Sequence, residues 1–422
     1  MTRSRSSILG TESTQKARLE GPGMAGPIAA ALRPLQLVPL SWAHLRTHHR
    51  PGAGVTALYR VQAAPRPGSA ARAGKLLHLQ VGATTSSLSG GGNGTTVRGT
   101  VENTAVRLWV HPRDPVLSGL PWATSAQAVA AGLFGGSQDR DRPSLRLTAY
   151  RPLRRAVIRA TYNGSTAYLK VPQPRLGPGL RRRLEAAAAA GLPVPPLLPI
   201  APGAGPDQDC VLALGALPGR SFHQQLSAGP ASGFDPAALL DLLAGLPAEA
   251  LDFSRKPAWA ERVQDYGVGA AAALPQMAPR IVRCAGDIDA AVRSSDAGPV
   301  VPAHGDFHGG NLLALPGPKG PRISGLLDVD ALGPGHRVDD LACFLGHLFV
   351  AAALNPRSAG LRSAAERCAE AFSAETGHAA LYSRSAAVAL TLVAGASGRG
   401  SRAAGQALAA AEELLARCRG RF

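Results

Sequence analysis

The apolar residues of this chain change their spacing near residue 219, and that change restricts the fold more than any other feature. Before it, short apolar runs rich in β-branched and aromatic residues are separated by Gly, Pro and Asn, which is typical of strands. After it, apolar residues recur at helical spacing. The predicted helices include 236–246, 341–354, 359–372, 379–393 and 403–418. Strands followed by helices indicate an α+β fold rather than a doubly wound sheet.

The strands are predicted in two regions, and a helix over 180–190 follows the second. The predicted strands are 55–62, 75–82 and 100–110 in the first region, and 145–150, 156–162 and 165–171 in the second. Asn163-Gly164 predicts a two-residue hairpin, because both residues tolerate positive φ. Leu79-Gln80-Val81 weakly resembles Leu169-Lys170-Val171. An internal duplication and a chance likeness between hairpins both explain that similarity.

The length of 422 residues suggests two or three domains. We predict a disordered polar tail over residues 1–24 and an N-terminal β-rich region over 25–140. A second β-rich region over 141–218 and a helical region over 219–422 follow.

Composition argues against several classes of protein. The net charge is +17, but only five of the 45 basic residues are lysines, and the arginines are spread along the chain. With 5% aromatics and no long basic run, this does not favour a nucleic-acid binder. No long apolar run predicts a membrane span, and the polar N-terminus lacks the apolar stretch of a secretory signal. Five scattered cysteines without a CxxC pair favour a cytoplasmic protein with reduced thiols.

The residues best suited to chemistry lie in the string His304-Gly305-Asp306-Phe307-His308-Gly309-Gly310-Asn311. Phosphoryl transfer needs a carboxylate near the accepting hydroxyl and oxygen ligands for Mg²⁺. Asp306 and Asn311 lie five residues apart on one tight loop, so one can face the acceptor and the other a metal. Asp328 follows a predicted strand over 322–327 that can return to the same point. Carboxylate and amide oxygens suit the hard Mg²⁺ ion.

Other interpretations of these residues remain open at the level of sequence. His304, Asp306 and His308 are also the residue types that bind the metal of a hydrolase, although that site needs further ligands. Asp328 and Asp330 are compatible with an exposed turn. Asp339 is expected to be solvated, and the cysteines are expected to be small buried apolar residues.

The full set of motifs resembles one family. The string from His304 to Asn311, then Leu326-Leu327-Asp328 and Asp340-Leu341-Ala342, is similar to the pattern of the aminoglycoside phosphotransferase and choline kinase superfamily. The resemblance covers roughly residues 141–422. It implies a two-lobed protein-kinase-like fold, with a β-rich, ATP-binding N-lobe and a helical, substrate-binding C-lobe. Residues 25–140 would be an additional β-rich cap.

The resemblance also implies roles for individual residues. Asp306 would be the catalytic base, and Asn311 and Asp328 would bind Mg²⁺. His304 and Asp340 would support the catalytic loop. Lys170 would reach the nucleotide phosphates, and Glu185, on the following helix, would pair with it. The implied cofactors are therefore ATP and Mg²⁺, with a nucleotide and a small-molecule acceptor as the binding partners.

Two departures from the pattern restrict the interpretation. The turn expected to cover the phosphates, residues 151–155, contains no Gly-x-Gly-x-x-Gly, so Arg154 or Arg155 either supplies charge there or is solvated. No Ala-Pro-Glu segment follows Asp328, which argues against a protein kinase with an activation loop.

The acceptor is predicted from charge and composition. From residue 341 to the end, five acidic residues stand against nine arginines, which disfavours a polycationic acceptor. Sparse aromatics disfavour choline, which calls for an aromatic cage. We therefore predict transfer of the γ-phosphate of ATP to a hydroxyl of a sugar or another small alcohol. The alternatives are an aminoglycoside kinase and a catalytically idle kinase fold with a regulatory role, although the complete set of candidate residues argues against an idle fold.

Overall fold

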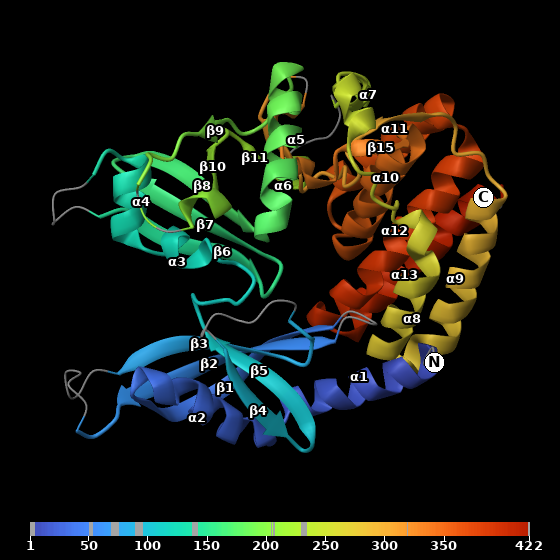
Figure 1. Cartoon of the computed structure of the whole chain (residues 1–422). Helices are drawn as coiled ribbons and strands as arrows, with labels where there is room; N and C mark the ends of the chain where they lie inside the picture. The colour runs from blue at the N-terminus through green and yellow to red at the C-terminus, as the bar shows by residue number, and fades with distance from the viewer. Residues whose placement is uncertain are drawn as a thin grey trace. The chain divides into compact units, whose positions relative to one another are not determined.

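A computed structural model describes residues 5–49, 54–68, 76–88, 96–136, 142–203, 205, 207–228, 234–318 and 320–420. The chain divides into two compact units, which are considered separately (Figure 1). The first unit comprises residues 1–178 and 197–215, and the second comprises 179–196 and 216–422. The first holds two antiparallel sheets and the second is mostly helical, which confirms the predicted α+β class.

The first sheet of the first unit has five strands in the order β1-β2-β3-β5-β4. The strands are β1 (Leu37–His49), β2 (Val55–Pro65), β3 (Leu77–Thr84), β4 (Val97–Val101) and β5 (Thr104–Val110). Sequence patterning missed β1, which carries Pro39 at a register shift against β2, the kind of position that tolerates proline. The single strand predicted over 100–110 is a hairpin, because Glu102 and Asn103 both take positive φ.

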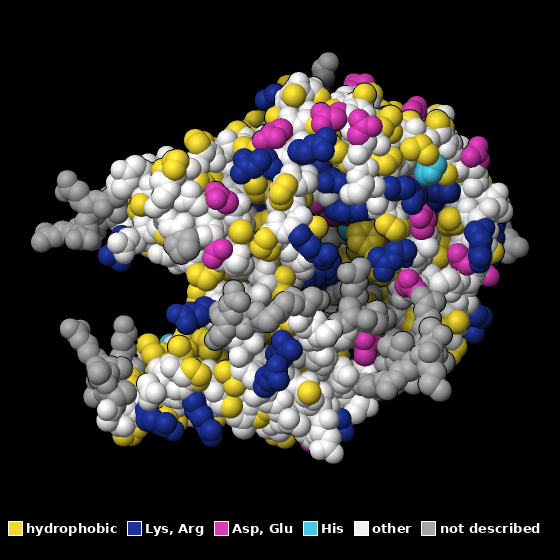
Figure 2. All heavy atoms as spheres, in the orientation of Figure 1, with side chains coloured by type: hydrophobic (Ala, Val, Ile, Leu, Met, Phe, Trp, Pro, Cys, Tyr) yellow, Lys and Arg dark blue, Asp and Glu magenta, His cyan; other side chains and the backbone are white. Residues whose placement is uncertain are grey.

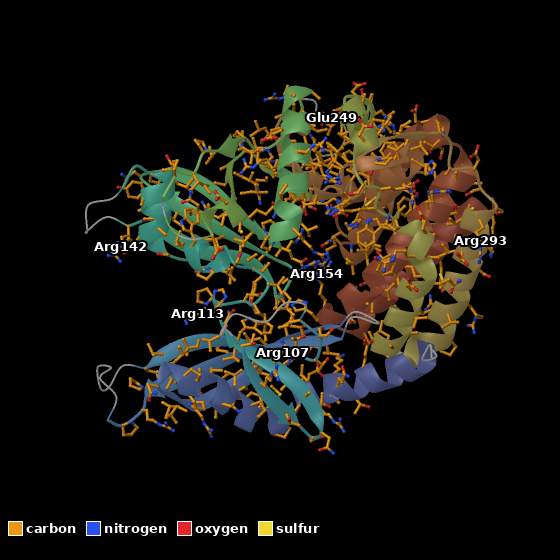
Figure 3. The ribbon with its side chains drawn as sticks, viewed as in Figure 1. Arg107, Arg113, Arg142, Arg154, Glu249 and Arg293 are labelled. Atoms are coloured by element: carbon orange, nitrogen blue, oxygen red, sulfur yellow. The ribbon has the colours of Figure 1, made fainter. Side chains whose placement is uncertain are left out.

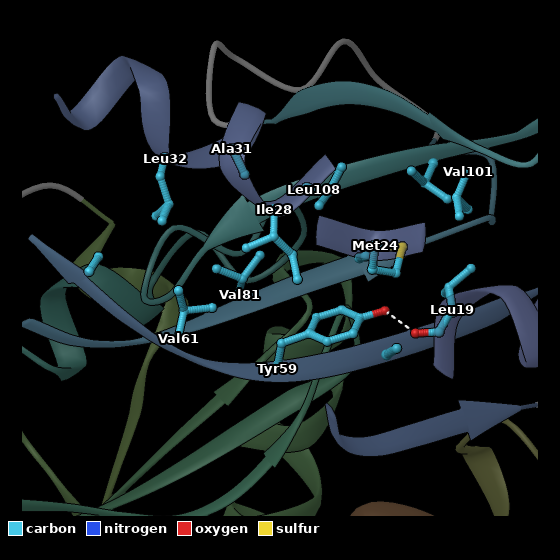
Figure 4. Close-up of a cluster of buried hydrophobic side chains, with 14 of the residues drawn as sticks. Leu19, Met24, Ile28, Ala31, Leu32, Tyr59, Val61, Val81, Val101 and Leu108 are labelled. Carbon is cyan, nitrogen blue, oxygen red and sulfur yellow. Dashed lines mark hydrogen bonds between the residues drawn. The ribbon is translucent and has the colours of Figure 1, made fainter. Parts of the chain in front are cut away.

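Two helices pack on this sheet, α1 (Arg5–Glu20) and α2 (Ala25–Leu32). Tyr59, Leu19, Met24 and Ile28 are fully buried between them and the sheet (Figure 4). The Tyr59 hydroxyl donates to the Leu19 carbonyl at 2.6 Å. Residues 5–24 therefore differ from the expected disordered tail. Their polar composition is misleading because α1 docks partly through polar contacts, such as the one between Glu12 Oε1 and the Gly54 amide.

The second sheet has the order β6-β7-β8-β10-β9, which repeats the strand order of the first. Its strands are β6 (Ser144–Arg151), β7 (Arg155–Tyr162), β8 (Ser165–Pro172), β9 (Leu197–Leu198) and β10 (Leu212–Gly215). Asn163 and Gly164 take φ of 47° and 76° and join β7 to β8, which confirms the predicted hairpin. The common strand order agrees with an internal duplication.

A shared apolar cluster packs one face of the second sheet against the segment that joins the two sheets. That segment contains α3 (Leu120–Ala123) and α4 (Ala126–Leu133). Leu58 from β2 joins Leu117, Trp122 and the second-sheet residue Ile158 in the cluster. The two sheets of the first unit are therefore tied together by buried apolar surface.

The second unit begins within α5 (Gly177–Ala189) and continues after β10. Its helices are α6 (Phe222–Ala228), α7 (Ala237–Ala244), α8 (Val263–Ala273), α9 (Ala278–Arg293), α10 (Arg337–Leu354), α11 (Ala359–Thr376), α12 (His378–Ala396) and α13 (Ser401–Cys418). Its short strands are β11 (Arg220–Ser221), β12 (Val300–Ala303), β13 (Leu312–Leu315), β14 (Arg322–Leu326) and β15 (Gly333–His336). The buried Phe344 ring of α10 contacts Phe222, Phe307 and Phe372, so one aromatic core joins α6, α10, α11 and the 304–311 loop.

Within the described residues, one segment, His378–Arg399, is long and apolar enough to span a membrane, and most of it is buried within the protein. A buried helix of that composition is a core helix. On the face in Figure 2, the Lys and Arg side chains are dispersed among acidic and apolar ones.

Candidate active site

The 304–311 loop connects β12 to β13 and is held by a buried carboxylate. Asp340, in the first turn of α10, is 1% exposed. Its Oδ2 accepts from the His304 amide at 2.6 Å and its Oδ1 from the Gly305 amide at 2.8 Å. Gly305 has a φ of 77°, and a Cβ there would lie 2.8 Å from Ala331 Cβ. The start of the loop is thus fixed in a conformation that only glycine adopts without strain.

The far end of the loop returns to Asp306. Asn311 Nδ2 donates to the Asp306 carbonyl at 2.9 Å and lies 3.4 Å from Asp306 Oδ2. The Asn311 amide donates to the His308 carbonyl at 2.8 Å. Because Nδ2 is the atom that contacts Asp306, the side-chain oxygen of Asn311 is the atom suited to bind a metal ion.

Asp328 is brought to the same loop by two hydrogen bonds of Leu327. The Leu327 amide donates to the Asn311 carbonyl at 2.7 Å, and the Leu327 carbonyl lies 3.0 Å from His304 Nε2. Asp328 itself is half-buried, with a φ of 58°. Asn311 and Asp328 therefore lie on neighbouring backbones, and together they offer an amide oxygen and a carboxylate.

This donor set fits Mg²⁺. Magnesium takes one or two protein oxygens and completes its shell with water and phosphate oxygens. In contrast, no group of three or more His, Cys, Asp or Glu residues that could hold a metal occurs in the described part of the chain. The alternative of a metal hydrolase site at His304, Asp306 and His308 thus lacks the further ligands that it needs.

Burial shifts the titration of the groups that support the loop. It lowers the pKa of His304, despite the nearby Leu327 carbonyl and the Asp306 and Asp328 carboxylates, and so favours the neutral imidazole. Burial also raises the pKa of Asp340 to about 7, against the opposite effect of its two amide donors.

Three histidines cluster at the loop, and two of them, His223 and His347, were not assigned to the site from the sequence. The His308 and His347 rings stack with centroids 4.2 Å apart, and His308 Nε2 is 3.9 Å from Asp306 Oδ1. His223, from α6, is so close to the loop that a Cβ on Gly309 would lie 2.5 Å from its Cδ2. Burial lowers the pKa of His308 and the pKa of His347. Burial also lowers the pKa of His223, to about 4, so neutral rings are favoured at all three positions. No spacing in the sequence connects these three histidines, because they come from separate elements.

The expectation for Asp339 is wrong. Its side chain is 17% exposed and its Oδ1 lies 3.2 Å from Nε of Arg384, which is itself 8% exposed. The partner comes from α12, 45 residues along the chain, so no local pattern predicts the ion pair.

Lys170, predicted to reach the nucleotide phosphates, and Glu185, predicted to pair with Lys170, belong to different units. Lys170, in the first unit, lies on β8 opposite Val157 of β7 and Leu212 of β10, and is 8% exposed. Glu185, in the second unit, is an exposed residue of α5. That helix is fixed within its unit by Arg183, whose Nε donates to the Leu332 carbonyl at 2.8 Å. The pairing of Lys170 with Glu185 stays a prediction.

The turn between β6 and β7, residues 151–155, belongs to the first unit. Arg154, labelled in Figure 3, is part of this turn. Leu153 has a φ of 62°, a backbone conformation in which glycine is usually found. The turn adopts this conformation although it contains no glycine.

This chain is similar to one protein family and, at low sequence identity, to several solved structures. A family model described as the phosphotransferase enzyme family matches residues 153–382, more than half of the chain. A thermostable mutant of aminoglycoside phosphotransferase APH(4)-Ia is 15% identical, with 69% of this chain and 98% of that chain covered and a TM-score of 0.46. A choline/ethanolamine kinase family protein from Mesorhizobium loti is 18% identical, with coverages of 66% and 87% and a TM-score of 0.39. Choline kinase from Cryptosporidium parvum is 8% identical, with coverages of 69% and 94% and a TM-score of 0.44. A search of curated sequences finds no significant match.

Proposed function

The chain belongs to the phosphotransferase enzyme family, and from that premise we propose that it transfers the γ-phosphate of ATP to a hydroxyl group of a small molecule. The fold is the mixed α+β, kinase-like fold, in which the family domain begins at residue 153 and follows an additional N-terminal sheet. The observation that carries the proposal is the hydrogen-bonded loop that joins Asp306, Asn311 and the backbone next to Asp328.

Asp306 is the base in this proposal. Its carboxylate is 30% exposed, and so it is accessible to an acceptor hydroxyl. It accepts or orients the hydroxyl proton while the oxygen attacks the γ-phosphorus, which is the role of the aspartate in the corresponding kinase loop. Asn311 helps to hold Asp306 through the bond from Nδ2 to the Asp306 carbonyl.

Asn311 and Asp328 are the proposed ligands of Mg²⁺. The bound ion would neutralise charge on the nucleotide phosphates. His304 and Asp340 hold the two backbones that carry these ligands. Lys170 is proposed to contact the nucleotide phosphates and Glu185 to orient Lys170. The buried position of Lys170 on a central strand supports a specific role.

A sugar or another small alcohol is the proposed acceptor. Three histidines at the 304–311 loop, His308, His347 and His223, lie in surroundings that favour the neutral form, and a neutral imidazole both donates to and accepts from hydroxyl groups. The helical part from residue 341 onwards carries more arginines than acidic residues, which disfavours a polycation. We also propose that the protein is cytoplasmic, in keeping with its five free cysteines.

The test is ATP consumption by the purified protein with separate pools of sugars, aminoglycosides and amino alcohols. We expect Mg²⁺-dependent turnover with the sugar pool. Turnover with aminoglycosides alone would refute the proposed acceptor class. Nucleotide binding without turnover in any pool would favour the idle, regulatory alternative.

Asp306→Ala tests the proposed base. We expect turnover to fall by about 10²–10⁴-fold while ATP binding persists, because the variant removes only the group that handles the hydroxyl proton. Asp241→Ala, which removes an exposed carboxylate of α7 in the same unit, is the matched control and keeps full turnover. Unchanged turnover in Asp306→Ala would refute the assignment.

A further inference from the structure

The turn between β6 and β7 contains a leucine in the left-handed backbone region. The Arg154 amide donates to the Arg151 carbonyl at 3.0 Å and closes the turn, and Leu153 within it takes a φ of 62°. A leucine in the left-handed region is strained relative to glycine, so contacts from outside the turn must stabilise this conformation. Both the amide and the carbonyl of Leu153 make such contacts.

The first contact comes from Asp114, which precedes α3 in the segment that joins the two sheets. Asp114 is 4% exposed and uses both carboxylate oxygens. Its Oδ1 accepts from the amides of Val116 at 2.9 Å and Leu117 at 3.2 Å. Its Oδ2 accepts from the Tyr150 hydroxyl and the Leu153 amide, both at 2.8 Å. Burial raises the pKa of Asp114, and these four donors oppose that rise.

Two neighbours complete the arrangement. Gln173, after β8, donates from Nε2 to the Leu153 carbonyl at 2.7 Å. Trp109, on β5 of the first sheet, donates from Nε1 to the Tyr150 hydroxyl at 3.0 Å. Leu153 is therefore held at its amide and at its carbonyl, and the network extends from the first sheet to the turn of the second.

We propose that Asp114 is a positioning residue for the nucleotide: by holding Leu153, it fixes the 151–155 turn in the conformation that covers the phosphates. This inference rests on the proposed function. Glycine-rich loops of kinases approach the phosphates through flexible backbone, whereas here a buried carboxylate fixes a glycine-free turn. A turn fixed before binding loses less conformational entropy when the nucleotide arrives. The segment after the first sheet thereby acquires a role in nucleotide affinity.

Asp114→Asn alters the contacts at Oδ2, with the Leu153 amide and the Tyr150 hydroxyl, and keeps an acceptor for the other two amides. The amide oxygen can still accept from Val116 and Leu117, but its NH₂ group cannot accept from the Leu153 amide. We expect the KM for ATP to rise about tenfold, because that factor corresponds to the loss of one buried hydrogen bond to a charged group. The kcat and the KM for the acceptor should change less than twofold. Amide hydrogen exchange of residues 151–155 should become faster.

Glu12→Ala is the matched control for general destabilisation. Glu12 is also buried, at 5% exposure, and accepts from the Gly54 amide, which immediately precedes β2 of the first sheet. This variant should lower the melting temperature but leave the KM for ATP and the exchange of the turn unchanged. Gln173→Leu removes the hydrogen bond to the Leu153 carbonyl and should have the same effects as Asp114→Asn. It therefore provides a second test if Asp114→Asn folds poorly.

The outcomes separate this inference from the proposed function. Unchanged exchange of the turn in Asp114→Asn overturns the inference, whether or not the wild type uses ATP. An equal rise in KM for ATP in Asp114→Asn and Glu12→Ala overturns it as well. Wild-type protein that neither binds nor consumes ATP overturns the proposed function, and with it the positioning role for a nucleotide. Faster exchange of the turn in the variant would then still establish the contact itself.

Discussion

Asp340 is the residue on which the candidate loop most depends. It lies near the start of α10, 36 positions after His304, and satisfies two consecutive amides of the 304–311 loop. Such a carboxylate stabilises the loop only while the surrounding protein excludes water, because a solvated side chain would have water as an equal partner. The same exclusion of water raises its pKa to about 7.

That shift predicts a pH dependence of stability. The folded protein binds the Asp340 proton up to a pH of about 7, whereas the unfolded chain releases it near the ordinary pKa of 3.8. The contribution of this group to stability is therefore greatest below about pH 4 and falls as pH rises to about 7. Asp340→Asn removes the titrating group and with it this pH dependence. The difference in unfolding free energy between the wild type and the less stable variant should therefore shrink as pH rises from about 4 to about 7.

Urea unfolding from pH 4 to pH 8 measures the effect. Asp241→Asn, an exposed aspartate on α7, should keep the wild-type dependence. Parallel curves for wild type and Asp340→Asn would contradict the pKa shift. A lower turnover of Asp340→Asn at all pH values is also expected, because an amide can accept at its oxygen but not at its NH₂ group.

At the scale of elements, α10 organises the second unit. It carries Asp340 and His347 near the loop and Phe344 in the aromatic core, and it packs closely on α12. The close approach occurs at Gly346, where a Cβ would lie 2.7 Å from the Ser385 carbonyl oxygen and 2.9 Å from Val388 Cβ. The absence of a side chain at Gly346 therefore sets the distance between the two helices.

Gly346→Ala and Gly405→Ala form a matched pair of helix substitutions. Gly346→Ala should destabilise the protein by about 1–3 kcal/mol, because the added methyl group has no space. Gly405, in α13, has no atom within 4 Å of an added Cβ. Gly405→Ala should stabilise the protein by about 0.5–1 kcal/mol through helix propensity. Melting temperatures measure both, and a stabilised Gly346→Ala would contradict the close packing of α10 on α12.

At the scale of the whole molecule, the residues that we propose to bind the nucleotide and the metal are distributed over both units. Lys170 lies on β8 of the first unit, whereas Asp306, Asn311 and Asp328 lie in the second. A ligand that binds only the folded protein stabilises it in proportion to its affinity, by about 2.7 kcal/mol at a concentration 100 times the Kd. Thermal stability with and without ATP and Mg²⁺ therefore reports on the assigned residues.

We expect ATP with Mg²⁺ to raise the melting temperature of the wild type and of Asp306→Ala. Lys170→Met should lose most of this rise. Lys75→Met, which changes a lysine outside the described residues, should keep it, since only the second of the two similar β-regions carries a lysine within its Leu-x-Val segment. An equal loss in both lysine variants would contradict the choice of Lys170.

The sequence determined the features that depend on neighbouring residues. The Asn163-Gly164 hairpin follows from residues that tolerate positive φ, and the helices from α10 to α13 follow from apolar spacing. The candidate loop was recognisable because Asp306 and Asn311 are only five residues apart, and their hydrogen bond forms within one turn of chain.

The tertiary structure decided the contacts between residues far apart in the chain. Asp114 meets Leu153 across 39 residues, and Asp339 meets Arg384 across 45. The polar segment over residues 5–20 becomes a helix because it docks on a sheet, and His223 and His347 reach the 304–311 loop from separate helices. Backbone preference is local, so it can be read from adjacent residues. The partner of a buried polar group is selected by the packing of the whole chain, and no spacing in the sequence encodes it.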